Sequence, residues 1–302
     1  MKLFAPEYYK KFKCIADRCR HSCCIGWEIN VDRDALSRFR ALGERGEKIL
    51  ATIDFESETP HYKLLSGERC PHLDSTGLCR IITECGEDYL CDICREHPRF
   101  YNFPVGRCEV GLGAACEEAA RLILSCENYM RVSPLSDIGE AECEESEKGF
   151  DAVGEREAVY KILSDATRPY PERLSEIYRK YGVSPLDKTD GDWRSLISEL
   201  EYLDGKSKEI FLSYLSASFP ASFSFAERAL AYFIYRHTAS AESPEDFAIS
   251  LGLSLLLERL FSSVTAAYSP ENIEAHALAL RLISEEIEYN EENTDLIKSE
   301  FM

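Results

Sequence analysis

The sequence lacks the long apolar segments of membrane and secreted proteins. No run of apolar residues approaches the roughly 20 that a helix needs to cross a bilayer. The first residues pass directly into charged and aromatic sequence, without the apolar stretch of a signal peptide. We therefore expect a cytoplasmic protein that has no membrane partner.

Positive charge is also scarce. The chain has 302 residues, with 35 Lys and Arg against 54 Asp and Glu, a net charge of −19. Residues 1–130 hold 18 Lys and Arg against 21 acidic residues, whereas the remainder holds 17 against 33. Nucleic-acid binding needs a cationic surface, so we expect no nucleic-acid partner. The acidic part favours a basic protein or peptide as partner, unless its charge serves only solubility.

The common cysteine signatures of metal proteins are missing as well. The sequence has neither the C-x2-C-x2-C run of ferredoxins nor the paired C-x2-C knuckles of zinc ribbons. Cys19 and Cys23 have the first spacing of the C-x3-C-x2-C motif of radical S-adenosylmethionine enzymes, but Gly26 occupies the third position. The spacing therefore argues against ordinary radical chemistry and does not choose between iron–sulfur and zinc.

Cysteine itself is abundant. Of the 13 cysteines, 12 lie between Cys14 and Cys126, and the last is Cys143. A reducing cytoplasm disfavours disulfides, and clustered thiols in such a protein more often bind metal or perform redox chemistry. The odd count also fits poorly with a complete disulfide framework.

Four cysteine groups predict metal binding, to an iron–sulfur cluster or to zinc. Thiolates are soft ligands that suit both, and short spacings let one loop deliver two of them. The fourth group is a single cysteine before a helix, whose dipole favours a thiolate. Nine ligands exceed one site, so either two sites exist or some of the nine are bystanders. The predicted ligands are Cys14, Cys19, Cys23, Cys24, Cys70, Cys79, Cys91, Cys94 and Cys116, whereas plain apolar or surface roles are expected for Cys85, Cys108, Cys126 and Cys143.

The predicted fold is mainly α, with an irregular cysteine-rich metal-binding N-terminal region packed on a C-terminal helical bundle. We expect a metal-binding region over 1–130, an acidic linker over 131–149 and a helical domain over 150–302. The N-terminal region should hold short strands at 27–31 and 109–113, a turn at 71–79, and helices at 33–42, 88–96 and 117–124. The bundle helices are expected at 155–164, 171–181, 193–202, 207–216, 225–237, 244–267 and 270–288.

Four strings in the cysteine-rich part resemble a known family. They read FKCIADRCRHSCCIGWEI, CPHLDSTGLCRI, GEDYLCDICREHPRFYN and GLGAACEEAARLIL. Together they are similar to the flagellin lysine-N-methylases of bacteria, and the middle strings also resemble small zinc- or iron-chelating domains. The resemblance covers Tyr8 to about Leu124 and extends only loosely into the helical part.

The resemblance implies an activity, a cofactor and a partner. Members of the family transfer methyl groups from S-adenosylmethionine to lysine ε-amino groups of flagellin and are described as carrying a 4Fe-4S cluster. The segment that directly precedes Cys116, Gly-Leu-Gly-Ala-Ala, departs from the family pattern, which usually has serines there. The family pattern is matched best by Cys19, Cys23, Cys24, Cys70, Cys79, Cys94 and Cys116, with Cys14 also fitting and Cys91 matching less closely.

Two readings remain open. An S-adenosylmethionine-dependent protein lysine methyltransferase predicts a pocket at the seam between the cysteine region and the bundle. No glycine-rich methyltransferase loop is present beyond Gly111-x-Gly113, and the catalytic base is not identified. The alternative is a non-enzymatic iron–sulfur or zinc-binding module for redox chemistry, iron handling or interaction. One helix face is either a substrate pocket or ordinary packing: Tyr232, Tyr235, Arg236 and His237.

Overall fold

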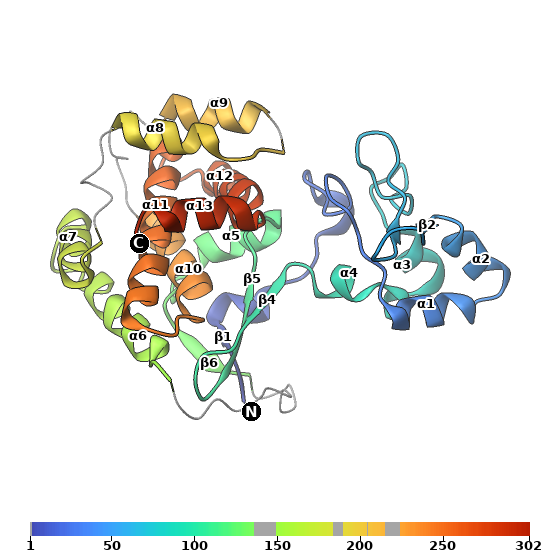
Figure 1. The fold of residues 1–302 in the computed structure, drawn as a ribbon, viewed down its shortest axis with the longest axis horizontal. Helices are drawn as coiled ribbons and strands as arrows, with labels where there is room; N and C mark the ends of the chain where they lie inside the picture. The colour runs from blue at the N-terminus through green and yellow to red at the C-terminus, as the bar shows by residue number, and fades with distance from the viewer. Residues whose placement is uncertain (1, 136–148, 184–189, 204, 215–223) are drawn as a thin grey trace. The chain divides into compact units, whose positions relative to one another are not determined.

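The computed structural model describes residues 2–135, 149–183, 190–203, 205–214 and 224–302. The chain forms two compact units (Figure 1), which are described separately. The cysteine-rich unit comprises Lys13–Arg99, and the helical unit comprises Met1–Phe12 together with Phe100–Met302. The prediction of a mainly α protein with a few short strands is confirmed.

The cysteine-rich unit has little regular structure. Its buried core combines side chains of the helices, of the short strands and of the loops between them, including Phe39, Tyr62 and Ile81. Its elements are the 3-10 turns η2 (Ala16–Arg18) and η3 (Glu87–Tyr89), the helices α1 (Arg33–Arg40), α2 (Glu44–Leu50), α3 (Arg80–Cys85) and α4 (Asp92–Glu96), and the paired strands β2 (Ile53–Asp54) and β3 (His61–Tyr62).

Some of the elements expected in this unit are present, and others are not. Asp32 caps α1 as expected, accepting a hydrogen bond from the Ala35 amide at 2.7 Å. The expected strand at 27–31 is not formed, although Ile29 and Val31 are buried as its alternation predicted. This segment makes a single bridge, between Asn30 and His61, because its partner β3 is only two residues long. The helix expected at 88–96 is a 3-10 turn followed by the shorter α4.

A small sheet opens the helical unit. Its strand order is β4-β5-β1-β6, with β1 parallel to β5 and antiparallel to β6. Only β5 was expected from the sequence, because the other strands are very short. The strands are β1 (Leu3–Pro6), β4 (Arg99–Asn102), β5 (Cys108–Leu112) and β6 (Val132–Pro134).

Each helix expected after residue 150 is present, with shifted ends. Ser243 caps α11 as predicted, whereas the helix expected from residue 270 begins at Ile273 with Asn272 as its cap. A π-helical segment, η5 (Ser284–Glu288), follows it, and α13 was not anticipated. The helices are η1 (Glu7–Lys11, 3-10), α5 (Glu117–Ser125), α6 (Ala152–Leu163), α7 (Tyr170–Tyr181), α8 (Asp190–Glu199), α9 (Gly205–Tyr214), α10 (Ser224–Thr238), α11 (Pro244–Thr265), α12 (Ile273–Ile283) and α13 (Glu291–Ser299).

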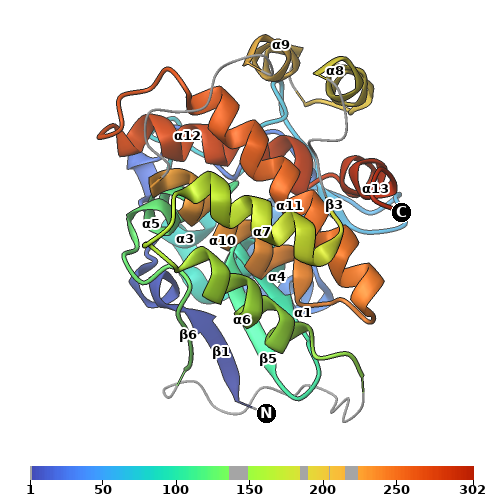
Figure 2. The ribbon, with the colours of Figure 1, turned by 90° about the vertical axis from the view of Figure 1, so that its left-hand side faces the viewer.

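Helix α11 is the centre of the helical unit. It packs against α9, α10, α12 and α13, as the two views in Figures 1 and 2 show. By length and composition it could cross a membrane, contrary to our expectation that no segment could. However, 78% of its most apolar window is buried inside the protein, as in the core helix of a bundle.

The structure divides the chain elsewhere than expected. Helix α5 packs against α10 and α12, and β5 pairs with β1, so residues 100–130 belong with the helical unit. The expected boundary after residue 130 followed the last clustered cysteine, which is not where the packing changes. Of the expected linker, Val132–Pro134 is strand β6, and residues 136–148 lie outside the described part.

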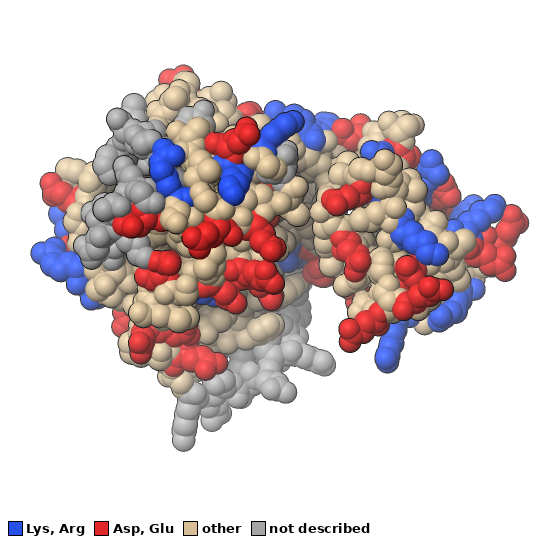
Figure 3. All heavy atoms as spheres, turned by 45° about the horizontal axis from the view of Figure 1, so that its top comes forward, with Lys and Arg blue, Asp and Glu red and all other residues tan. Residues whose placement is uncertain are grey.

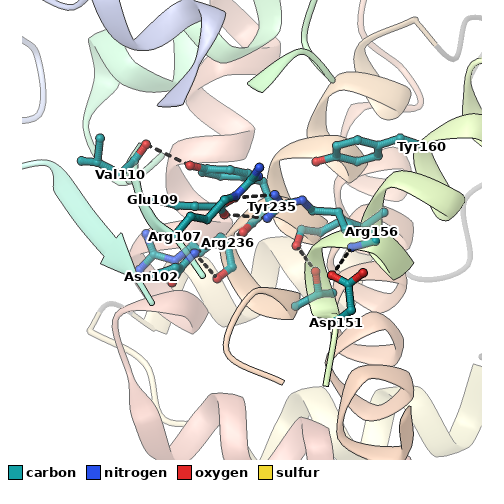
Figure 4. A network of polar contacts seen from close by, with 12 residues as sticks. Asn102, Arg107, Glu109, Val110, Asp151, Arg156, Tyr160, Tyr235 and Arg236 are labelled. Atoms are coloured by element: carbon teal, nitrogen blue, oxygen red, sulfur yellow. Dashed lines mark hydrogen bonds and ion pairs between the residues drawn. The ribbon is translucent and has the colours of Figure 1, made fainter. Parts of the chain in front are cut away.

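A buried ion pair joins the sheet to the bundle (Figure 4). Arg156 on α6 donates two hydrogen bonds to Glu109 on β5, at 2.7 and 2.6 Å, and both side chains are at most 1% exposed. Arg107 pairs with the same carboxylate. Tyr235 of α10 packs its ring 4.9 Å from the Arg156 guanidinium and donates to the Val110 carbonyl at 3.0 Å. The network therefore fixes α10 against β5.

Loss of Arg156 should destabilise the helical unit strongly. The substitution Arg156→Met leaves Glu109 in the core without its bidentate partner, which costs about 3–5 kcal/mol for a buried pair. Urea unfolding followed by circular dichroism measures the change. Arg168→Met removes a half-exposed pair with Asp165 and should cost less than about 1 kcal/mol. Equal losses in the two variants would contradict the role of the buried network.

Candidate functional site

Five cysteines of the predicted set lie together in the core of the cysteine-rich unit. Cys70 and Cys91 are buried, and the other three are partly buried against the same core. The Cys70 amide donates to the Cys24 carbonyl at 2.8 Å, which brings the first two cysteine groups together. The thiols are near enough to shift one another's pKa. This thiol cluster consists of Cys24, Cys70, Cys79, Cys91 and Cys94.

Two members of the thiol cluster have a lowered pKa. A hydrogen bond from Cys23 lowers the pKa of Cys24 to about 7 despite the opposing effect of burial. A hydrogen bond from Cys94 lowers the pKa of Cys91, again against burial, and the Tyr62 hydroxyl lies 3.3 Å from the Cys91 sulfur. Burial raises the pKa of Cys70 to about 12. A bound metal would replace the protons that these thiols share, because metal ligation requires thiolates.

Backbone contacts hold the Cys91–Cys94 segment in place. Asp32 caps α1 with one carboxylate oxygen, and its other oxygen accepts from the Asp92 amide at 2.7 Å. Arg38 donates to the Leu90 carbonyl at 2.9 Å. Helix α1 therefore positions the start of α4, and with it both cysteines of the C-x2-C pair.

A tight loop presents the other pair, Cys70 and Cys79. Asp74 accepts hydrogen bonds from the Thr76 amide at 2.7 Å and the Leu78 amide at 3.0 Å, and Gly77 has φ +85°. An aspartate in this role and a glycine at positive φ are typical of turns. The turn expected at 71–79 is thus confirmed.

The other predicted ligands are not members of the thiol cluster. Cys14 and Cys23 are exposed in the loop that opens the unit, and Cys19 there donates to the His21 carbonyl at 3.1 Å. Cys116 belongs to the helical unit, where it begins α5. Within the described ranges, no three His, Cys, Asp or Glu side chains meet at the spacing of a metal site. The thiol cluster therefore has the donor chemistry of a thiolate-bound metal without a preformed coordination geometry.

The cysteines outside the predicted set differ among themselves. Cys85 packs at the edge of the cysteine-rich core, and Cys126 is buried in the helical unit, as expected for apolar roles. Cys108 is fully buried on β5 and is disulfide-bonded, which the sequence interpretation did not anticipate. Cys143 lies outside the described residues.

His72 supports the loop of the thiol cluster. Its Nε2 atom lies 3.0 Å from the Thr52 hydroxyl, which itself donates to the Ile49 carbonyl at 2.6 Å. Because that hydroxyl proton is engaged, Nε2 must carry the proton and donate. Burial lowers the pKa of His72 to about 4, so the ring is neutral near pH 7. His72 therefore anchors the loop between Cys70 and Cys79 to Thr52 through a hydrogen bond.

A second polar site lies in the helical unit around Glu288. This carboxylate, at the end of η5, accepts from His237 Nε2 at 2.7 Å and from the Tyr232 hydroxyl at 2.8 Å. Arg236 Nε lies 3.3 Å from the same carboxylate. The Tyr232 hydroxyl in turn accepts from the Ala114 amide at 2.9 Å. The site therefore joins α10, η5 and the turn before α5.

The electrostatics of this site keep Glu288 ionised. Burial alone would raise the pKa of Glu288, but Arg236 and His237 outweigh it and hold the pKa at about 2. Burial lowers the pKa of His237, which leaves its ring neutral near pH 7. A fixed arginine–carboxylate pair beside a neutral histidine is the result.

The Glu288 site opens into a pocket of about 210 Å³. Gly113 lies close to Arg236, one of the lining residues: an added Cβ would be 2.1 Å from the Tyr289 hydroxyl and 3.0 Å from Arg236 Nη1. Gly113 belongs to the segment before Cys116 in which the family usually has serines. The structure has no room for a side chain at this position. The pocket is lined by Phe100, Tyr101, Asn102, Arg236, His237, Glu288, Thr294 and Lys298.

Sequence reasoning found half of this site. It singled out the α10 face with Tyr232, Arg236 and His237, of which the last two line the pocket and the first holds Glu288. It missed Glu288 itself, because the surrounding acidic run reads as a solvated helix end. The sequence did offer one signal that Glu288 is buried: it directly follows Ile287, which belongs to the buried apolar positions of this helix.

Removing a clustered thiol should release the metal. We expect Cys70→Ala to lose most of the bound iron or zinc after anaerobic purification and to unfold at lower temperature, because metal binding supplies folding energy. Elemental analysis and thermal unfolding measure the two effects. Cys85→Ala, a half-buried thiol of the same unit, is the matched control and should keep its metal. Equal metal content in the two variants would exclude Cys70 as a ligand.

Gly113→Ala should destabilise the helical unit. The added methyl group must displace Tyr289 or Arg236, and such overpacking costs about 1–3 kcal/mol. Gly205→Ala is the control, since nothing lies within 4 Å of its added Cβ. A melting temperature that falls in neither variant would show that the space around Gly113 is larger than described.

Comparison with known proteins finds relatives over part of the chain. Over 135 residues, 42% of this chain, it is 28% identical to lysine-N-methylases of Salmonella typhimurium and Salmonella choleraesuis. Over 127 residues, 40% of the chain, it is 28% identical to the flagellar biosynthetic protein FliU of Salmonella muenchen, with 75% of that protein covered. The match spans only 34% of the lysine-N-methylases. No family model and no solved structure matches the chain. The chain is thus related in part to proteins named lysine-N-methylase and FliU.

Proposed function

We propose that this chain is a cytoplasmic S-adenosylmethionine-dependent methyltransferase that acts on lysine side chains of flagellin or a similar surface protein. The observation that carries the proposal is the similarity to lysine-N-methylases and to FliU. The thiol cluster adds support, since the resemblance from sequence implies a 4Fe-4S cluster, and thiols from three segments lie in one core.

The donor set fits an iron–sulfur cluster in its chemistry. Its ligands would come from Cys24, Cys70, Cys79, Cys91 and Cys94: four of these thiolates would fill a 4Fe-4S cluster, and three would hold it with one iron open. The pKa values of Cys24 and Cys91 are already lowered. When bound, such a cluster supplies Lewis-acidic iron that takes oxygen or nitrogen donors. Tyr62 would act beside it, with its hydroxyl 3.3 Å from the Cys91 sulfur, as a hydrogen-bonding group that tunes the sulfur.

Methyl transfer to lysine sets simple requirements. The neutral amine nitrogen attacks the methyl carbon of the sulfonium, the carbon–sulfur bond breaks with its electron pair left on sulfur, and one proton leaves the nitrogen. A group must therefore take the ammonium proton before the attack. Carboxylates attract a lysine-bearing protein, and Figure 3 shows acidic side chains spread over the helical unit.

A non-enzymatic metal-binding module is the second candidate. The observation in its favour is that the match spans only 34% of the lysine-N-methylases, so parts of those proteins have no counterpart in the match. Such a module would bind iron–sulfur or zinc and serve in redox chemistry, iron handling or interaction. It would not methylate any protein.

Methylation of flagellin tests the proposal. The anaerobically purified full chain is incubated with S-adenosylmethionine and flagellin from the same source organism, and intact-protein mass spectrometry reads the product. We expect additions of one methyl mass on lysine residues, lost in Cys70→Ala and kept in Cys85→Ala. The metal-binding module would be favoured if the protein binds metal but methylates neither flagellin nor any protein in a total surface-protein extract.

A further inference from the structure

We propose that the Glu288 pocket of the helical unit binds an oxyanion group, a carboxylate or a phosphate, of a small molecule. The pocket is built from residues of the helical unit alone. The inference goes beyond the proposed function, because it holds whether or not the protein transfers methyl groups.

The charge of the pocket is positive within a strongly acidic chain. Arg236 and Lys298 line it, and among the described residues Glu288 is the only acidic one in its lining. The Glu288 side chain is 0% exposed, and both of its oxygens already accept hydrogen bonds, from His237 and Tyr232. Both oxygens of Glu288 are therefore already engaged within the protein, and Arg236 and Lys298 are the cationic side chains that line the pocket.

Arg236 is held as a rigid cationic group. Its guanidinium lies 4.8 Å from the ring of Phe100 and 4.8 Å from the ring of Tyr289, so aromatic side chains stack against it. The pair with Glu288 fixes its orientation as well. A planar guanidinium that is already ordered loses little entropy when it binds an oxyanion, and its geometry suits a carboxylate or a phosphate.

The remaining lining groups suit a small molecule that carries such an anion. Lys298, on α13, is half-buried and adds a second cation on a flexible side chain. Tyr101 is 43% exposed and can cover an apolar or aromatic part of the ligand. The volume of about 210 Å³ admits one charged group and excludes a folded protein segment.

Isothermal titration of the full chain with two matched ligand pairs tests this inference. S-adenosylhomocysteine is compared with its decarboxylated analogue, and AMP with adenosine, so that the two arms separate a carboxylate from a phosphate. We expect one oxyanion-bearing ligand to bind at least about tenfold more tightly than its partner, the usual effect of a charged hydrogen bond. The affinity should fall as salt rises.

Variants assign that binding to the pocket. Lys298→Gln removes a half-buried surface cation and should weaken the ligand about three- to tenfold, and Arg236→Gln should weaken it more. Lys180→Gln, an exposed cation on α7, is the matched control and should bind as the wild type does. Circular dichroism checks the fold of Arg236→Gln, and Lys298→Gln carries the test if that variant unfolds.

Two results would overturn the inference. One is that neither S-adenosylhomocysteine nor AMP binds better than its partner without the oxyanion. The other is that Lys298→Gln binds as tightly as the wild type, which would place the ligand elsewhere. Oxyanion binding in a protein that methylates nothing would keep this inference and reject the proposed function, so the two failures are distinguishable.

Discussion

The buried carboxylate of Glu288 constrains much of the helical unit. An ionised group without access to water must be matched by charges and hydrogen-bond donors, and here they come from α10 and from the turn before α5. Meeting that need brings Arg236 and His237 to one wall of a pocket and leaves no room for a side chain at Gly113. The π-helical turn matters because it ends at this glutamate, and such turns are frequent at functional sites.

The cysteine-rich unit is organised on a different principle. Its helices are short and its strands have two residues each, so regular structure supplies little of its stability. Caps and loop contacts bring separate segments to the same core, where Asp32 joins two helices and Asp74 closes the loop between two cysteines. Small units of this kind are often completed by a metal, which converts binding energy into folding energy. The five thiols that lie in one core are the groups that such a metal would bind.

The sequence predicted what depends on local signals. Helical periodicity located the bundle, the caps at Asp32 and Ser243 are confirmed, and the spacing of Cys70 and Cys79 indicated a shared loop. The rest depends on contacts between distant segments. The parallel pairing of β1 with β5 joins residues about a hundred positions apart, and the burial of Glu288 depends on α10. The strand pairing leaves no trace in the local pattern, and the position of Glu288 beside Ile287 does not by itself distinguish a buried glutamate from a solvated helix end. Neither was predicted, and the unit boundary was misplaced because it too depends on long-range packing.

Visible absorption of the anaerobically purified protein, with iron and sulfide analysis of the same sample, tests the central claim that the clustered thiols hold an iron–sulfur cluster. The account predicts a broad blue absorption with about four irons and four sulfides per chain, and a spectral change when S-adenosylmethionine is added. A colourless protein that holds only stoichiometric zinc and does not respond to S-adenosylmethionine would contradict it.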